Sequence, residues 1–271
     1  MTDTAVGPLL QYWRKVRQLS QLALASEAGV SSRHLCFVET GRARPSRDMV
    51  LLLCNTLDVP LRERNTLLLA AGFAPEFAET PLDAPALQAV RRALDAILAQ
   101  QEPFPAVVMN PRWDIVKANR AASNLFAFLL EGQQPPREPA NVLRLMFHPD
   151  AVRPFVANWA AVAEALLRRV HREAVGGVKD EATRALLHEI LAYPGVPASL
   201  GHKAVSTGSP AVPIIPVGFR KAGREYDFFS TVTTLGTPTD VTAQEIRIEC
   251  FFPANARTAE RARAELTGGA I

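Results

Sequence analysis

The sequence predicts two domains, an all-α domain of five short helices followed by an α+β domain. Residues 9–71 form five apolar-striped segments, and residues 74–85 carry three prolines. Beyond residue 103, short apolar strands accompany helices. With 271 residues and 48% hydrophobic content, the chain is long enough for two cores. We expect a first domain at 1–74, a linker and connecting helix at 75–102, a second domain at 103–254 and a C-terminal tail at 255–271.

Helical spacing and turn residues define the five N-terminal segments. In residues 9–19, apolar side chains three apart should face inward (Leu10, Trp13, Val16), with Arg14, Lys15 and Arg17 outside. Ser46 should begin the fourth helix, whose apolar stripe is Met49, Leu52, Leu53 and Leu57. The fifth helix should span 61–71 and end at Gly72.

Residues 19–45 contain the second and third helices of this domain. Ser20 and Ser31 are helix-capping residues, and Gly29 and Gly41 suit the left-handed backbone at which helices end. The inner faces should carry Leu22, Ala25 and Ala28 in the first of these helices, and Leu35 and Val38 in the second. Two helices joined by a glycine-centred turn form a helix-turn-helix, whose second helix enters the DNA major groove.

Polar side chains should cover the outer face of the second helix. Ser32, Arg33 and Phe37 point away from the apolar face, and an arginine can pair with guanine O6 and N7. Gln21 begins the preceding helix, where a phosphate is favoured. The alternative is an ordinary helical hairpin with a polar outer surface.

The segment from Ser20-Gln21 through Glu39-Thr-Gly41 to Pro45-Ser46 resembles the lambda-repressor-like, or xenobiotic-response-element, class of DNA-binding domains. More closely, it is similar to the N-terminal domain of MmyB-like transcription regulators. This resemblance implies base contacts from Ser32, Arg33 and Phe37, and phosphate contacts from Gln21, Arg42 and Arg44. Phe37 replaces a polar residue of many repressors, and either contacts a thymine methyl or packs. The DNA-binding surface we expect comprises Gln21, Ser31, Ser32, Arg33, His34, Phe37, Arg42 and Arg44.

Charge is concentrated in the first domain. Residues 1–75 hold nine Arg/Lys and six Asp/Glu, whereas the other 196 residues hold 21 of each. Between Arg14 and Arg47, seven basic residues face two acidic ones, a local excess of +5 that favours a polyanionic partner. The sequence shows no signal peptide and no apolar run of about 18 residues, so we expect a cytoplasmic protein without a membrane segment.

The C-terminal domain alternates strands and helices. We expect strands at 105–109 and 112–117, joined by Asn110-Pro111, then a helix from Asn119 through Leu130. Helices should follow at 141–147, 151–173 and 181–191, and strands at 205–207, 212–219, 226–235 and 245–252, with a tight turn at residues 222–224. This order matches a PAS-like sensor domain. The connecting helix at 87–100 either docks on a domain or pairs with its copy in a dimer.

Several C-terminal stretches look like the MmyB-like ligand-binding domain: Pro105–Arg120, Asn141–Phe147, Asn158-Trp159, Phe228–Asp240 and Glu249–Pro253. The resemblance implies a PAS-like fold that holds an apolar small molecule, with fatty acyl chains as natural candidates. The ligand-binding residues we expect are Trp113, Asn119, Phe126, Arg144, Phe147, Phe155, Trp159, Phe219, Phe229 and Phe251. Asn119 has a structural alternative as a helix cap. Arg144, in an apolar helix, needs either a protein carboxylate or a ligand headgroup as its partner.

Catalytic chemistry has little support in the sequence. Neither the histidines nor the three scattered cysteines, Cys36, Cys54 and Cys250, show metal or redox spacing, and no G-x-S-x-G or phosphate-binding glycine loop occurs. We therefore expect a non-enzymatic, sequence-specific DNA-binding regulator that needs no cofactor or metal. It should bind a palindromic operator as a homodimer and respond to an apolar effector such as a fatty acid or acyl derivative. The alternative makes the C-terminal domain a ligand-free dimerisation or protein-docking module.

Overall fold

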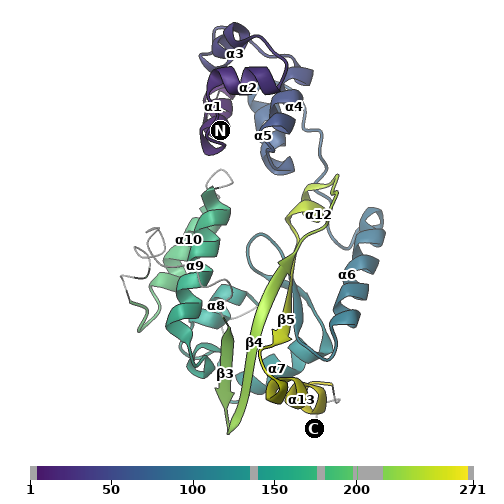
Figure 1. The fold of residues 1–271 in the computed structure, drawn as a ribbon, viewed down its shortest axis with the longest axis vertical. Coiled ribbons are helices and arrows are strands. Elements are labelled where there is room, and N and C mark those ends of the chain that lie inside the picture. The colour runs from purple at the N-terminus through teal and green to yellow at the C-terminus, as the bar shows by residue number, and fades with distance from the viewer. Residues whose placement is uncertain (1–4, 135–139, 176–180, 198–199, 201–215, 268–271) are drawn as a thin grey trace. The chain divides into compact units, whose positions relative to one another are not determined.

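The computed structural model describes residues 5–134, 140–175, 181–197, 200 and 216–267. The chain divides into two compact units. Within the described residues, the first is built from the chain up to Pro81 together with Thr237–Gln244. The second contains the rest, from Leu82 to Gly236 and from Glu245 onward. Figure 1 shows the helices and strands of each unit.

The first unit holds the five expected helices: α1 (Val6–Val16), α2 (Gln21–Glu27), α3 (Ser32–Glu39), α4 (Arg47–Thr56) and α5 (Leu61–Ala70). The serine caps are confirmed. The Oγ of Ser20 accepts a hydrogen bond from the Ala23 amide at 3.0 Å, and Ser31 and Ser46 cap α3 and α4 in the same way. These caps satisfy amides that have no partner inside the helix.

Two apolar side chains lie outside the core that their spacing predicted for them. Leu22 is 70% exposed and Leu52 is 41% exposed. Their neighbours Leu24 and Val50 are buried instead. The other residues of each predicted stripe are buried as expected, so only the edge of each apolar face differs. The packing of the five helices decides which of the neighbouring apolar side chains point inward.

A buried ion pair joins α1 to α3 and corrects the expectation that Arg14 lies outside. Arg14 is only 9% exposed, and its Nε and Nη2 donate to the two carboxylate oxygens of Glu39 at 2.7 and 2.8 Å. The Nε2 of Gln21, at the start of α2, donates to the same carboxylate at 2.8 Å. One carboxylate thus connects the three helices that surround the turn.

The same carboxylate titrates abnormally. Burial by itself would raise the pKa of Glu39, but the hydrogen bonds from Arg14 and Gln21 outweigh it, and the pKa is lowered. Charge-assisted, two-point pairing of this kind is stronger than a neutral hydrogen bond. Glu39 is therefore ionised in the folded protein at neutral pH.

Gly7 allows α1 to approach the end of α3. A Cβ atom at this position would lie 2.5 Å from the carbonyl oxygen of Glu39 and 2.7 Å from that of Val38. Such distances are shorter than any real contact, so a side chain here would force the helices apart. The helix containing Gly7 begins at Val6, three residues before the predicted start.

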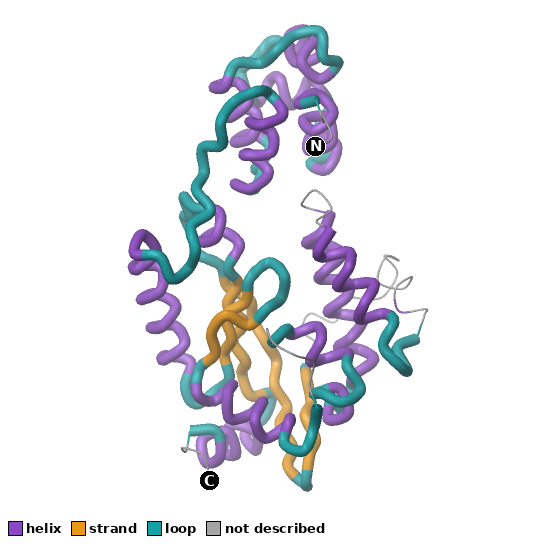
Figure 2. Tube along the Cα trace, turned by 180° about the vertical axis from the view of Figure 1, so that it is seen from behind, coloured by secondary structure: helices purple, strands orange, loops and turns teal. Residues whose placement is uncertain are grey.

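Within its described residues, the second unit is built on one antiparallel sheet of five strands: β1 (Ala106–Met109), β2 (Ile115–Ala118), β3 (Val217–Lys221), β4 (Arg224–Thr233) and β5 (Arg247–Pro253). The strand order is β2-β1-β5-β4-β3. The curled sheet with flanking helices is an α+β arrangement consistent with a PAS-like fold, as predicted. Figure 2 shows the strands grouped together with helices around them.

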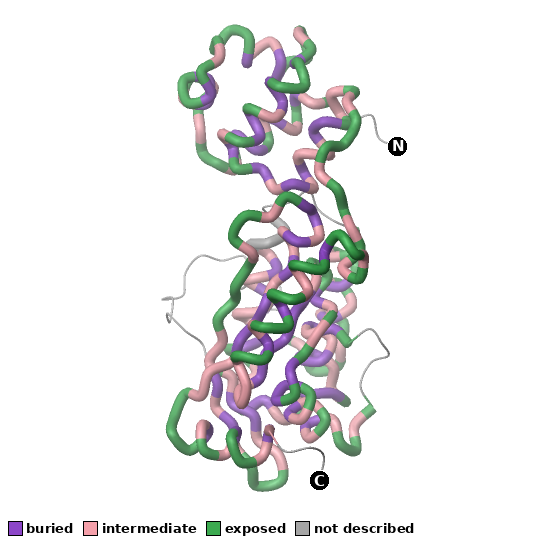
Figure 3. The backbone as a smooth tube through the Cα atoms, turned by 90° about the vertical axis from the view of Figure 1, so that its right-hand side faces the viewer, coloured by how far each residue is buried: buried purple, intermediate pink, exposed green. Residues whose placement is uncertain are grey.

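Both faces of the central strands are buried. Ala106 and Val108 of β1 pack with Leu94 and Leu98 of α6 (Gln88–Gln101), whereas Val107 and Met109 belong to the larger core on the other face. This alternation follows from the two-residue period of a strand. The connecting helix predicted at 87–100 therefore docks on the sheet of the second unit. Docking on a domain was one of the two alternatives expected for this helix. Figure 3 shows buried stretches of the backbone in the interior of this unit.

The other face of the sheet is covered by α7 (Arg120–Leu130), α8 (Val142–Phe147), α9 (Trp159–Val175) and α10 (Glu181–Leu191). Asn119 caps α7 as expected, its side chain accepting from the Ala122 amide. The helix predicted at 151–173 begins only at Trp159, because residues 153–155 form a separate 3-10 helix, η2 (Arg153–Phe155). Another short 3-10 helix, η1 (Pro85–Leu87), precedes α6.

The second half of this unit matches the predicted strands only in part. The turn between β3 and β4 is confirmed, with Ala222 and Gly223 at φ 47° and 73°. The predicted strand at 205–207 and the first part of that at 212–219 lie outside the described residues. In the part of the chain that the structure describes, two α-helices were not predicted: α12 (Val241–Glu245), between β4 and β5, and α13 (Ala256–Glu265), which packs on β4. Among the described residues, every helix is too short or too polar for a membrane span.

Replacing Glu39 by Met should destabilise the helix-turn-helix by about 3 kcal/mol, because it leaves the buried Arg14 without its carboxylate. The double variant Arg14→Met/Glu39→Met should recover most of this loss. Native-state hydrogen exchange of α3 amides, followed against urea concentration, measures both. Glu27→Met, at an exposed position on α2, is the matched control. Since the folded pKa of Glu39 is lowered, its contribution should be present at neutral pH and fade as pH falls below about 4.3. Equal stability of single and double variants would contradict the pairing.

Candidate functional site

The turn between α2 and α3 has the backbone that the sequence predicted. Gly29 lies at φ 65°, and the Val30 amide donates to the Ala25 carbonyl at 2.9 Å. This left-handed ending satisfies carbonyl groups at the end of α2 and reverses the chain. Leu35 and Val38 of α3 are fully buried, so the opposite side of that helix forms the surface.

The expected DNA-binding residues gather on and beside this outer side of α3. Ser31, Ser32, Arg33, His34, Arg42 and Arg44 are exposed, and Gln21 and Phe37 are half-buried. The guanidinium of Arg33 lies over the ring of Phe37, one helical turn away, at 5.5 Å from its centroid. A cation held on an aromatic face is favourable, and the stack orients the guanidinium along the helix.

Gln21 already has a partner within the domain, because its Nε2 donates to Glu39. The amide nitrogen carries two hydrogens, so one remains for another acceptor. The phosphate contact expected for Gln21 stays a prediction.

The loop after α3 holds two arginines. Gly41 lies at φ 74°, and the Arg42 amide donates back to the Phe37 carbonyl at 2.8 Å, which fixes the start of the loop. Arg42 and Arg44 make no ion pair with any described residue. The buried Arg14 and Glu39 neutralise each other. The other residues between positions 14 and 47 include six basic residues and one acidic residue, Glu27, so their net charge is still +5.

The second unit contains an apolar cavity of about 50 Å³ between the sheet and its covering helices. Strand residues Val107, Val217, Phe219 and Phe251 form one wall. Helices α7, α8 and α9 supply the other, with Phe126, Val142, Leu145, Met146, Val162 and Leu166. A cavity that binds benzene in a protein core measures about 150 Å³. An acyl chain therefore requires these walls to separate.

Glu249 is the only charged residue that lines this cavity among the described residues. It is 8% exposed, and its two oxygens accept from the Ser230 hydroxyl at 2.7 Å and from Arg169 of α9 at 3.0 Å. Arg169 also lies over the Trp113 ring, 4.5 Å from its centroid. The pairing offsets the cost of burying the carboxylate and ties β5 to α9.

The ten expected ligand-binding residues do not form one site. Phe126, Phe219 and Phe251 line the cavity. Phe147 and Trp159 pack against each other beside it in the same core, with ring centroids 5.8 Å apart, and Phe155 lies near Lys221. Phe229 stacks on Phe252, whose strand neighbour Phe251 faces the cavity, so Phe229 lies on the opposite face of the sheet.

Arg144 has a protein carboxylate as its partner. Its Nε and Nη2 each donate to Glu189 of α10 at 2.9 Å, and the Tyr193 hydroxyl donates to the same carboxylate at 2.6 Å. The hydrogen bonds from Arg144 hold the pKa of Glu189 below its usual value. The guanidinium thus needs no ligand headgroup to be satisfied, and Arg144 does not line the cavity.

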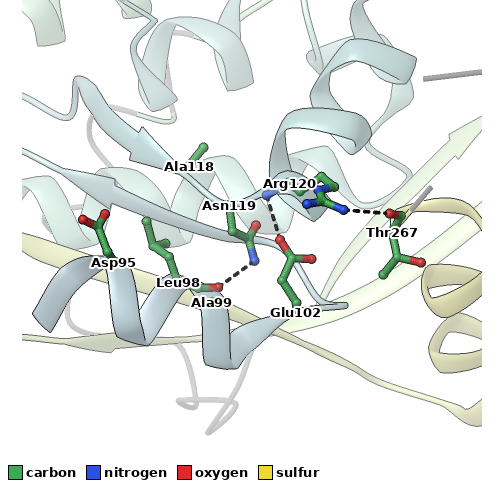
Figure 4. Close-up of a pocket in the computed structure, with 8 residues that line it drawn as sticks. All are labelled: Asp95, Leu98, Ala99, Glu102, Ala118, Asn119, Arg120 and Thr267. Atoms are coloured by element: carbon green, nitrogen blue, oxygen red, sulfur yellow. Dashed lines mark hydrogen bonds between the residues drawn. The ribbon is translucent and has the colours of Figure 1, made fainter. Parts of the chain in front are cut away.

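Asn119 lies at a different recess, which is open and measures about 410 Å³ (Figure 4). Its side chain donates to the carbonyl of Phe104 at 2.8 Å and accepts from the amides of Ala106 and Ala122. Beside it, Glu102 accepts from the Arg120 amide at 2.8 Å. These bonds join α6, β1 and α7, so the residues of this recess hold the fold together.

Most of the cavity wall is aliphatic, whereas the ligand-binding residues expected from the sequence are mainly aromatic. The aliphatic residues and Glu249 carry no individual signal. The two-residue period of a strand does provide a signal for four of the wall residues. Glu249 and Phe251 are two residues apart in β5, and Val217 and Phe219 are two residues apart in β3, so the members of each pair share a face of the sheet.

Comparison with known protein families agrees with both halves of this description. Residues 5–67 match a helix-turn-helix domain, and residues 90–264 match the MmyB-like transcription regulator ligand binding domain. No curated protein matches the chain. The second match alone covers well over half of the sequence. With its DNA-binding helix-turn-helix and its ligand-binding C-terminal domain, the chain belongs to the MmyB-like transcription regulators.

Proposed function

We propose that this regulator binds a specific palindromic operator as a homodimer and that an apolar effector in the cavity changes its operator affinity. The exposed outer side of α3 and the basic loop after it support the binding of DNA. The cavity lined almost entirely by apolar side chains supports the apolar effector. Its wall suits an acyl chain, so fatty acids and their derivatives are the first effectors to test.

The mechanism is linkage between two binding equilibria. A ligand that prefers one arrangement of the dimer changes DNA affinity by the ratio of its affinities for the two arrangements. For an acyl chain, the preferred state is one in which the helices over the sheet have moved apart, because about 50 Å³ does not hold the chain.

The small cavity also favours a second candidate function. A nearly solid core is what a ligand-free dimerisation or protein-docking module would have. Native mass spectrometry of the purified protein separates the two functions, since a copurifying lipid supports the effector and its absence supports the module.

Arg33 should read a base. Arg33→Ala should weaken binding to the specific operator by about 1–3 kcal/mol and relax the preference at one base pair, because a guanidinium-to-guanine contact is lost. Binding selections on random DNA, with each variant, measure both effects. Arg42→Ala is the matched control: it should weaken all sequences alike and reduce the slope of log affinity against log salt by about one unit. An unchanged base preference in Arg33→Ala would refute the assignment.

The operator should contain two half-sites whose centres lie roughly 34 Å apart, one turn of DNA, because a single short helix reads too few bases for useful specificity. Hydroxyl-radical footprinting combined with sedimentation measures site length and stoichiometry. Protection of one half-site by a monomer, at concentrations where no dimer forms, would contradict the homodimer.

Dodecanoate should raise the melting temperature of the C-terminal unit with the logarithm of its concentration above the dissociation constant. Val162→Phe, a cavity-wall residue on α9, should abolish this rise, because the larger ring occupies the ligand's space. Val232→Phe makes the same change at an exposed position on β4 and should retain it. Differential scanning fluorimetry gives all three curves. An unshifted melting temperature with dodecanoate and with extracted lipids would favour the dimerisation module.

A further inference from the structure

Residues 237–244 leave the second unit between β4 and β5 and fold as part of the first unit. They contain most of the short helix α12 (Figure 1). Asp240 is 9% exposed and Val241 is 1% exposed, so the segment is packed and not simply passing over a surface. Hydrogen bonds to α5 and to the linker after it hold the segment.

The first contact caps α5, the last helix of the DNA-binding domain. Pro60 precedes that helix and provides no side-chain cap. The amide of Leu61 instead donates to the Oε1 of Gln244 at 2.7 Å. The first amides of a helix have no partner inside it, so Gln244 supplies from a distant part of the sequence the bond that a local cap usually makes.

The other two contacts hold the linker that follows α5. The Val241 amide donates to the Ala78 carbonyl at 2.8 Å, and the Thr80 amide donates to the Asp240 carboxylate at 3.2 Å. Asp240 also accepts from the Ala243 amide, which caps α12 itself. The linker and the start of α5 are therefore both attached to residues 237–244.

The same segment leads directly into a wall of the apolar cavity. Glu249 and Phe251 line that cavity and follow Gln244 by five and seven residues. They lie in β5, which is hydrogen-bonded on both sides, to β1 and to β4. A strand held in this way moves as one piece, so a displacement at its cavity-lining residues reaches its start.

We propose that residues 237–244 couple the cavity to the DNA-binding domain: a change in the β5 wall alters the bonds that Gln244, Asp240 and Val241 make to α5 and the linker. The proposal rests on the proposed function only in naming the effector as the natural cause of that change. Two sites are coupled when both bias one element with two arrangements. Here that element is the segment, either bonded to the α5 start or released from it.

A mutational cycle tests the coupling without a ligand. Phe251→Ala perturbs the cavity wall, and Gln244→Ala removes the cap. Hydrogen exchange of the Leu61–Arg64 amides, measured by mass spectrometry on the full chain, reports the state of the α5 start. Gln244→Ala should accelerate that exchange about fivefold, the effect of one lost hydrogen bond. Phe251→Ala should accelerate it about twofold or more in the parent protein and leave it unchanged in Gln244→Ala. Gln88→Ala, on the exposed face of α6, is the control and should change neither.

Accelerated exchange in β5 of Phe251→Ala, with no change at Leu61–Arg64, would overturn the coupling. Circular dichroism verifies folding, and Phe251→Leu replaces Phe251→Ala if the latter does not fold. A dodecanoate titration separates the two proposals. If dodecanoate does not bind but the cycle shows coupling, the effector proposal fails and the segment's role stands. If dodecanoate binds, stabilises the C-terminal unit and leaves Leu61–Arg64 exchange unchanged, the segment's role fails and the effector proposal stands.

Discussion

The buried pairing of Arg14 with Glu39 is the interaction on which the DNA-binding domain depends. Glu39 lies at the end of α3, and its carboxylate bonds to α1 through Arg14 and to the start of α2 through Gln21. The pair removes two charges from water, a cost that two-point hydrogen bonding must offset. The pair fixes the position of α3 relative to α1 and α2. In this arrangement α1 lies so close to the end of α3 that only a glycine, Gly7, fits at their contact.

The ligand-binding domain depends on a different constraint, a sheet buried on both faces. The central strand β5 places Ile248 and Cys250 against α6, and Glu249 and Phe251 against the cavity. A strand packed on both sides cannot adjust one face without disturbing the other. The buried contact between Glu249 and Arg169 adds a polar bond across the cavity's edge. We expect filling of the cavity to displace whole elements of such a domain, and β5 is the strand that follows residues 237–244 in the chain.

Local sequence signals predicted much of this fold because they act over a few residues. Ser20, Ser31 and Ser46 cap helices, and the left-handed Gly29 and Gly41 end them, through bonds that need no distant partner. The Ala222-Gly223 turn between β3 and β4 has the same local origin. Exposure of the α3 outer face followed from the spacing of its apolar residues. Where periodicity failed, at Leu22 and Leu52, the helices were apolar on more than one side, so spacing alone did not choose the buried face.

Tertiary structure alone decided the partners of the charged residues and the members of the cavity. Arg14 and Glu39 are 25 residues apart, and Arg169 and Glu249 are 80 apart. No local pattern specifies such pairs, because they form only when separate helices and strands meet. The cavity likewise gathers aliphatic residues from both ends of the domain and leaves Phe229 on the opposite face. The sequence by itself determined the two domains, the helix-turn-helix and its exposed face. Packing between distant segments determined which charges are buried, which side chains surround the cavity, and where residues 237–244 are attached.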